Sequence, residues 1–168
     1  MPGKIRNDHR GLQPDLFESG CATGPENKVH EMYAVMYCDG ASRGNPGDAG
    51  IGVVISLSDK AYDHKECREY RISEHIGIAT NNVAEYRALI RGLEKAAELG
   101  VKRIRIFLDS ELLVRQIHGI YKVKNKNLMR LWTRAMQLLK EFVEYEVSHV
   151  RRELNAEADS LARQGTKR

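Results

Sequence analysis

The sequence predicts a single α/β domain, and three observations support that fold class. The chain has 168 residues, of which 42% are hydrophobic and only 7% aromatic, which is enough for one domain with a core of its own. Two runs rich in β-branched and aromatic residues, YAVMYC at 33–38 and RIRIFL at 103–108, are typical of strands. Between them, residues 81–99 place apolar or small side chains at helical period, as expected where helices alternate with strands.

The order of the elements follows from the same patterns. Residues 1–30 show little periodicity, so we expect a flexible tail, followed by a folded domain at 31–168. Short turns join the first three strands, which predicts an antiparallel meander with a glycine-rich turn at 40–50. The expected elements are strands at 33–38, 51–57 and 67–72, a helix at 81–99, a strand at 103–108, helices at 111–118 and 128–141, a strand at 143–150 and a last helix after 155.

Composition bounds the class of protein. The net charge of +4 arises after residue 30, because the first thirty residues hold four basic and four acidic side chains, and a modest positive excess suits a polyanionic partner. Three cysteines without a C-x-x-C pair favour a reducing, cytoplasmic setting. The N-terminus lacks an apolar h-region and the longest apolar run, near 51–57, is too short for a bilayer, so we expect no membrane or secretion signal.

Four carboxylates occupy positions that predict a metal site. Asp39 and Asp109 directly follow the two strand runs, and if those strands lie side by side and parallel, both acids project from the same carboxyl edge. Glu85 lies on the apolar face of the 81–99 helix, and Asp159 borders the inward stripe of the last helix. Like charges that close are costly unless a cation intervenes.

Each of these acids also has an ordinary explanation. An N-x-x-E capping box could account for Glu85, helix capping for Asp109, and a turn for Asp39. Asp159 has the weakest such explanation, since it follows the expected cap Asn155 by four residues and has no obvious partner. We favour the metal site because all four ordinary explanations would have to hold at once.

Four sequence motifs connect these acids to a known family. The runs DGASRGNPG at 39–47, TNNVAEYRAL at 80–89, FLDSELLV at 107–114 and NAEADSLA at 155–162 resemble type 1 ribonuclease H in order, spacing and content. The resemblance extends over about residues 33–165. It implies a ribonuclease H-like fold with a five-stranded mixed sheet, three antiparallel strands plus two parallel, flanked by helices. It also implies an endonuclease that hydrolyses the RNA strand of RNA/DNA hybrids and leaves 5′-phosphate and 3′-hydroxyl ends.

By this resemblance, the four acids hold two Mg²⁺ ions in the presence of substrate, with Mn²⁺ as a substitute. Asp39 would bridge both ions, Glu85 and Asp109 would hold the ion nearer the leaving group, and Asp159 would help hold the ion that carries the water. His149, ten residues before Asp159, is a candidate for the family histidine that helps the product leave. A structural or phosphate-facing histidine is an equal alternative, and the two arginines that follow it are alternative phosphate contacts.

The resemblance also implies contacts to the hybrid. The RNA strand is expected to meet groups that sense the 2′-hydroxyl, and the DNA strand a phosphate pocket that includes Thr80 and Asn125. Turn and cap chemistry is an alternative role for the asparagines, and the two roles are compatible. The candidate RNA contacts are Gly40, Ala41, Ser42, Asn45, Asn81 and Asn82.

Besides the loose spacing of the histidine, two departures from the family pattern concern the grip on substrate. A loop at 119–127 replaces the basic, Trp-rich protrusion of many bacterial members, and its three lysines are either substitute phosphate contacts or simply solvated. Glu111 stands where members often have a glutamine, and this acid could repel phosphate or assist metal binding. Trp132 lies at helical spacing among apolar residues, so we expect it in the core.

The tail adds a candidate partner. QPDLF at 13–17 resembles the Q-x-x-L-F peptide that binds bacterial sliding clamps, which makes Gln13, Leu16 and Phe17 candidate clamp contacts. Besides a monomeric hybrid nuclease, two alternatives stay open: a nuclease of the same fold that also acts on double-stranded RNA or branched DNA, and a hybrid-binding module without catalysis. Four intact acids argue against the last, because a phosphate-binding surface has no use for clustered negative charge.

Overall fold

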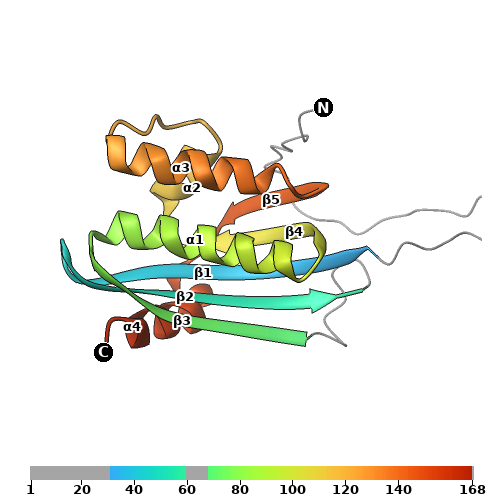
Figure 1. Ribbon diagram of the computed structural model, residues 1–168, viewed down its shortest axis with the longest axis horizontal. Coiled ribbons are helices and arrows are strands. Elements are labelled where there is room, and N and C mark those ends of the chain that lie inside the picture. Colours follow the sequence, from blue (N-terminus) through green and yellow to red (C-terminus); the bar gives the residue numbers. More distant parts are fainter. Residues whose placement is uncertain (1–30, 60–67, 168) are drawn as a thin grey trace, which may run out of the picture.

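A five-stranded mixed sheet with helices on both faces forms the domain (Figure 1). The computed structural model describes residues 31–59 and 68–167, so the tail at 1–30 and its candidate clamp peptide lie outside the described residues. The elements in chain order are β1 (Met32–Gly44), β2 (Gly47–Ser58), β3 (Arg68–Ala79), α1 (Asn81–Glu98), β4 (Val101–Leu108), α2 (Glu111–Ile117), α3 (Lys126–Leu139), β5 (Glu144–His149), a 3₁₀ helix (Arg152–Asn155) and α4 (Ala156–Gly165).

The sheet has the strand order β3-β2-β1-β4-β5. The β1–β2 and β2–β3 pairs are antiparallel, and the β1–β4 and β4–β5 pairs are parallel. The predicted fold class, with three antiparallel strands plus two parallel ones, is therefore confirmed. Because β1 and β4 are parallel neighbours, their C-terminal ends meet at the same edge of the sheet.

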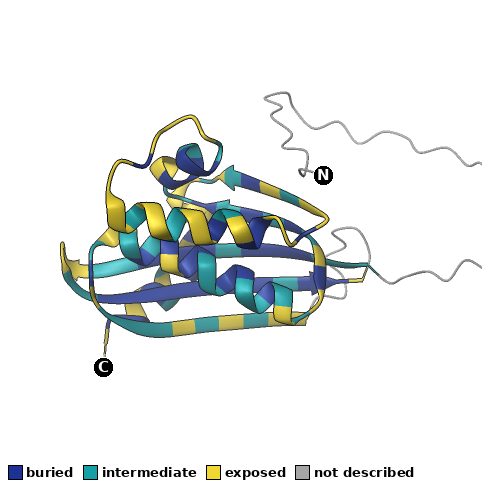
Figure 2. Ribbon diagram, turned by 45° about the horizontal axis from the view of Figure 1, so that its top comes forward, coloured by how far each residue is buried: buried dark blue, intermediate teal, exposed yellow. Residues whose placement is uncertain are grey.

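Different helices cover the two faces of the sheet. On one face, α1 packs across β1 and β2 with α3 beside it, and on the other face α4 packs on β1, β2 and β3 (Figure 1). The main core lies on the α1 side, where Met36 of β1 and Ile55 of β2 meet Leu89 and Leu93 of α1. Figure 2 shows the same contrast along the sheet: β2 is almost entirely buried, whereas the edge strand β3 carries many exposed residues.

The first hairpin is longer than the sequence indicated. The glycine-rich segment 40–50, expected as a turn, instead continues both strands, with paired residues from Gly40↔Ile51 to Gly44↔Gly47. Only residues 45 and 46 connect them. The third strand was also placed too short, because it runs to Ala79 and pairs with β2 over its whole length. Backbone hydrogen bonds to a neighbouring strand hold these segments extended, although glycine and serine have low strand propensity.

The helices agree more closely with expectation. α1 begins at Asn81 and ends at Glu98, and α3 lies two residues earlier than predicted. Trp132 packs against the main core and its indole nitrogen donates to the Gln116 carbonyl over 3.1 Å, which confirms its core role. Within the described residues, no helix combines the length and apolar content that crossing a membrane requires.

Candidate metal and nucleic-acid site

Three of the four predicted acids line one hollow at the carboxyl edge of β1 and β4. Asp39 lies within β1, Asp109 directly follows β4, and Glu85 lies in the first turns of α1. The parallel register between β1 and β4, with Tyr37 opposite Phe107, brings the two aspartates to the same edge. The hollow has a volume of about 590 Å³, and its other lining residues are Gly40, Ala41, Ser42, Arg43, Asn81, Arg152, Arg163, Thr166 and Lys167.

Gly40 allows the close approach that brings Glu85 to Asp39. A Cβ atom at this position would lie 2.2 Å from the carbonyl carbon of Ala84 and 2.2 Å from the amide nitrogen of Glu85. Both are backbone atoms of α1, so they cannot move aside without displacing the helix. A glycine next to Asp39 is therefore a packing requirement for the acid cluster.

The ordinary explanations for these three acids do not hold. The N-cap of α1 is Thr80, whose hydroxyl accepts from the Val83 amide, so Glu85 is not part of a capping box. Ser110, and not Asp109, caps α2. Asp39 lies within a continuous strand and not in a turn. None of the three carboxylates therefore has the capping or turn role that the sequence also allowed.

Asp159 forms ion pairs with two arginines, which its sequence context did not reveal. Its Oδ1 is 2.7 Å from Nη2 of Arg152 and its Oδ2 is 2.9 Å from Nε of Arg163, both of which line the hollow. Close packing of α4 on the sheet positions this acid, since a Cβ at Gly52 would lie 2.1 Å from the Ala158 carbonyl oxygen. Asp159 therefore forms ion pairs with two arginines of the hollow without lining the hollow itself.

The charges of the cluster perturb one another. Burial, together with the negative charges of Asp109, Asp159 and Glu85, raises the pKa of Asp39 to about 8, although a hydrogen bond from the Gly40 amide opposes the shift. Burial raises the pKa of Glu85 to about 7, although hydrogen bonds from Ser110 and Asn81 oppose it. An unneutralised cluster of this kind is unfavourable near neutral pH, and a bound cation would relieve it.

The pKa of Asp159 moves in the opposite direction. Burial of this carboxyl acts to raise its pKa, but hydrogen bonds and charge from Arg152 and Arg163 outweigh burial and hold the pKa below its usual range. The ionised form of Asp159 is thus stabilised, whereas burial disfavours the ionised forms of Asp39 and Glu85. The two arginines set this difference between the acids.

Asn155 is a functional candidate that sequence reasoning missed. It was expected to cap the last helix, yet its side chain makes no capping bond and is 1% exposed. Its Nδ2 donates to the Cys38 carbonyl over 3.1 Å and to Oδ1 of Asp109 over 3.2 Å. Because both partners are acceptors, the amide orientation is determined, and its buried Oδ1 has no hydrogen-bond partner in the part of the chain that the structure describes. No sequence signal distinguishes this role from a helix cap.

The donor set suits a hard divalent cation. Carboxylate oxygens are the ligands that Mg²⁺ prefers, and burial with mutual repulsion makes these acids gain from a cation. In residues 31–59 and 68–167, however, no three acidic, histidine or cysteine side chains are already arranged as a metal-binding cluster.

Four of the six candidate RNA contacts line the hollow, and a fifth is hydrogen-bonded to one of them. Gly40, Ala41 and Ser42 line the hollow, and Asn81 lines it while donating from Nδ2 to Oε1 of Glu85 over 3.0 Å. Asn45, at the tip of the first hairpin, accepts from the Asn81 amide over 3.2 Å. This bond joins the hairpin to the start of α1, so both elements are held at one edge of the hollow.

The other candidates are not among the residues that line the hollow. Asn82 is exposed at the start of α1, and Thr80 and Asn125 serve as N-caps of α1 and α3. His149 is exposed at the end of β5 and is absent from the lining of the hollow, whereas Arg152 belongs to it. Glu111 is bound to Arg115 over 2.6 Å on an exposed face of α2.

The sheet order and the acid-lined hollow define a ribonuclease H-like α/β domain. The family model described as "Reverse transcriptase-like" matches residues 37–165. A ribonuclease H of Polaromonas sp. is 32% identical, over 82% of this chain and 91% of its own length. LC11-RNase H1, solved in complex with an RNA/DNA hybrid, is 39% identical with a TM-score of 0.70, over 79% of this chain and 96% of the solved one.

The chain therefore belongs to the reverse transcriptase-like family, among the type 1 ribonucleases H. It is also 42% identical to the bifunctional protein Rv2228c of Mycobacterium tuberculosis, over 78% of this chain. It spans only about a third of that protein's length, because the match covers 35% of it.

Proposed function

We propose that this protein is a metal-dependent endonuclease that hydrolyses the RNA strand of RNA/DNA hybrids. The observation that supports it best is the hollow at the sheet edge, where Asp39, Glu85 and Asp109 come together without a local structural reason. Membership of a ribonuclease H family, and a similar protein solved with an RNA/DNA hybrid, support the choice of substrate.

The acids that would hold the metal are Asp39, Glu85, Asp109 and Asp159. When bound, two Mg²⁺ ions, or Mn²⁺ in their place, would acidify an attacking water and neutralise charge at the leaving oxygen, giving 5′-phosphate and 3′-hydroxyl ends. The raised pKa values of Asp39 and Glu85 mean that both acids gain most from such neutralisation. The proposal requires Asp159 to exchange at least one arginine partner for metal when substrate is present.

Neighbouring side chains orient the acids. Asn81 donates to Glu85 and Asn155 donates to Asp109, so each of these carboxylates has one oxygen held in place. A buried donor that satisfies one carboxylate oxygen leaves the other free to bind a cation. This is the part of the site that the protein builds before any ligand arrives.

The rim of the hollow would read the substrate. Backbone groups of residues 40–42 and the amides of Asn45 and Asn81 offer both donors and acceptors, which a 2′-hydroxyl can use and a deoxyribose cannot. We propose Arg152 as the phosphate-facing cation nearest the acids, since it lines the hollow and carries a full charge. That His149 helps the product leave, or contacts a phosphate itself, stays a prediction that mutagenesis can test.

The test is cleavage of end-labelled substrates by wild type and Asp39→Asn. We expect the RNA strand of an RNA/DNA hybrid to be cut when Mg²⁺ or Mn²⁺ is present, and the substitution to reduce the rate by at least about a thousandfold, since it removes a shared ligand. Glu98→Gln, an exposed acid at the far end of α1, is the matched control and should cut normally. The product ends are identified by treatment with phosphatase and polynucleotide kinase.

Three outcomes would contradict the proposal. Cleavage that survives Asp39→Asn, or that proceeds in EDTA, removes the carboxylate-metal mechanism. Cleavage confined to DNA removes the substrate assignment. Equal cleavage of double-stranded RNA and of hybrid would replace the proposed specificity with the broader nuclease alternative.

A further inference from the structure

A second hollow continues from the acid-lined one along the tip of the first hairpin. It has a volume of about 500 Å³ and is lined by Arg43, Asp48, Ile78, Thr166 and Lys167. Three of these residues, Arg43, Thr166 and Lys167, also line the acid-lined hollow. The two hollows therefore form one path that starts at the carboxylates and ends between the hairpin tip and the end of α4.

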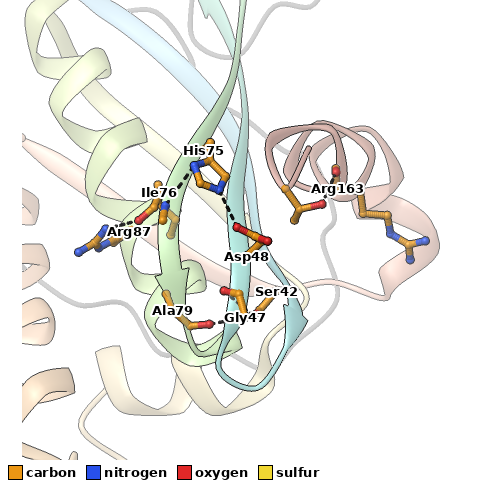
Figure 3. A network of polar contacts seen from close by, with 10 residues as sticks. Ser42, Gly47, Asp48, His75, Ile76, Ala79, Arg87 and Arg163 are labelled. Atoms are coloured by element: carbon orange, nitrogen blue, oxygen red, sulfur yellow. Dashed lines mark hydrogen bonds and ion pairs between the residues drawn. The ribbon is translucent and has the colours of Figure 1, made fainter. Parts of the chain in front are cut away.

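Arg43 lies on the same face of β1 as Asp39. Side chains four residues apart on a strand point the same way, and at ~3.3 Å per residue the two positions are separated by about 13 Å. The opposite residue on β2 is Asp48, which could have paired with Arg43 across the hairpin. Asp48 is engaged elsewhere, since its Oδ1 lies 3.3 Å from Nε2 of His75 on β3 (Figure 3).

Arg43 consequently keeps its charge available. No ion pair joins it to an acid within residues 31–59 and 68–167. The strand beneath it is nevertheless well held, because the hydroxyl of Ser42 donates to the Ala79 carbonyl over 2.8 Å (Figure 3). An exposed guanidinium on an ordered strand is suited to bind an oxyanion.

The end of α4 places a second cation next to Arg43. A Cβ at Gly50 would lie 2.4 Å from the Ala162 carbonyl oxygen, and one at Gly165 would lie 2.5 Å from the Glu74 carbonyl oxygen. The helix end is therefore packed backbone to backbone against the sheet. Lys167 follows the C-cap residue Thr166 and is exposed, and its amide donates to the Gln164 carbonyl over 3.0 Å.

We propose that Arg43 and Lys167 form a phosphate-binding site for the nucleic-acid strand that is cut at the carboxylates, a few nucleotides beyond the scissile phosphate. This rests on the proposed function. A strand entering a hollow lined by acids is repelled unless cations nearby compensate, and Arg43 and Lys167 supply positive charge where the acid-lined hollow meets the second one, whereas Arg152 and Arg163 are paired with Asp159. The site thus gives the domain a grip on substrate from the hairpin side.

The experiment compares binding of an RNA/DNA hybrid in an Asp39→Asn background, where the substrate stays intact. Fluorescence anisotropy over a series of KCl concentrations gives the Kd and its salt dependence. For Arg43→Gln with Lys167→Gln, we expect each change to weaken binding by roughly two- to fivefold. The slope of log Kd against log salt should fall by about 2 for the pair of changes, one for each lost phosphate contact.

The matched control is Lys102→Gln in the same background. Lys102 is exposed near the N-terminal end of β4, at the opposite edge from the acids, and its substitution removes the same charge. It should leave the Kd and the slope unchanged. Replacing single phosphates of the RNA strand by neutral methylphosphonates should abolish the difference between the double variant and its parent at one or two positions.

Unchanged Kd and slope in the double variant would overturn the site, and so would an equal loss in Lys102→Gln, since that would reflect net charge alone. A methylphosphonate effect confined to the DNA strand would overturn the strand assignment. Failure of the proposed function is separate: the parent protein would then not bind hybrid, and wild type would not cut it.

Discussion

Replacing Asp39 by asparagine should stabilise the metal-free protein while destroying the proposed activity. Asp39 is only 7% exposed, and Asp109, Asp159 and Glu85 add negative charge around it. Asparagine has nearly the same shape and carries no charge, so it removes the repulsion without leaving a cavity. A residue kept for structure would show the opposite effect on stability.

The size and sign of the effect follow from the pKa. Burial and the charges of the three neighbouring acids together raise the pKa of Asp39 from its usual 3.8 to about 8, so the folded chain binds this proton more tightly than the unfolded chain. The tighter binding of this proton stabilises the folded state fully below about pH 4, where Asp39 is protonated in both states. This stabilisation is lost as the pH rises through 8 and Asp39 ionises in the folded protein. At about 1.4 kcal/mol for each pH unit, the loss amounts to up to about 6 kcal/mol for wild type, and the variant avoids it.

Urea unfolding between pH 4.5 and 8.5 in EDTA measures this difference. The free energy of unfolding of wild type should fall over this range relative to Asp39→Asn, and the variant should be the more stable protein at pH 8. The control Glu98→Gln, at an exposed acid bound to Lys95, should follow the wild-type curve. Added Mg²⁺ should stabilise wild type more than the variant at pH 8. Parallel pH curves for wild type and Asp39→Asn would refute the reasoning.

Three further predictions concern packing and the tail. Asn155→Ala should cost about 2 kcal/mol in urea unfolding, because it removes two buried hydrogen bonds, one of them to a carboxylate; an unchanged midpoint would contradict it. Gly52→Ala should cost about 3 kcal/mol or more, since its Cβ would meet the backbone of α4, whereas Gly100→Ala, at a φ of +77° with open space around it, should cost about 1 kcal/mol. Equal costs at the two glycines would exclude the packing argument. Leu16→Ala with Phe17→Ala should abolish binding of the full chain to a purified sliding clamp in surface plasmon resonance, and binding that persists would remove the clamp contact.

Much of the fold was predictable because its signals are local. Alternation and β-branched residues located all five strands, and apolar period located the helices to within about two residues. The ends of the strands were predicted less accurately. At the first hairpin, for example, pairing between β1 and β2 continues both strands through a glycine-rich segment that was expected to be a turn. Pairing is a property of two segments, so the composition of one segment does not reveal where it stops.

The sequence alone selected the three acids that line the hollow, since Asp39 and Asp109 follow strand patterns and Glu85 lies on an apolar helix face. Only the tertiary structure decided what surrounds them. Asn155 reaches a carbonyl 117 residues away in the chain, and among the described residues Arg43 has no ion pair, because its cross-strand neighbour Asp48 pairs with His75. Local patterns record the conformation that a segment prefers, whereas hydrogen bonds and charges between distant segments depend on where the folded chain places them.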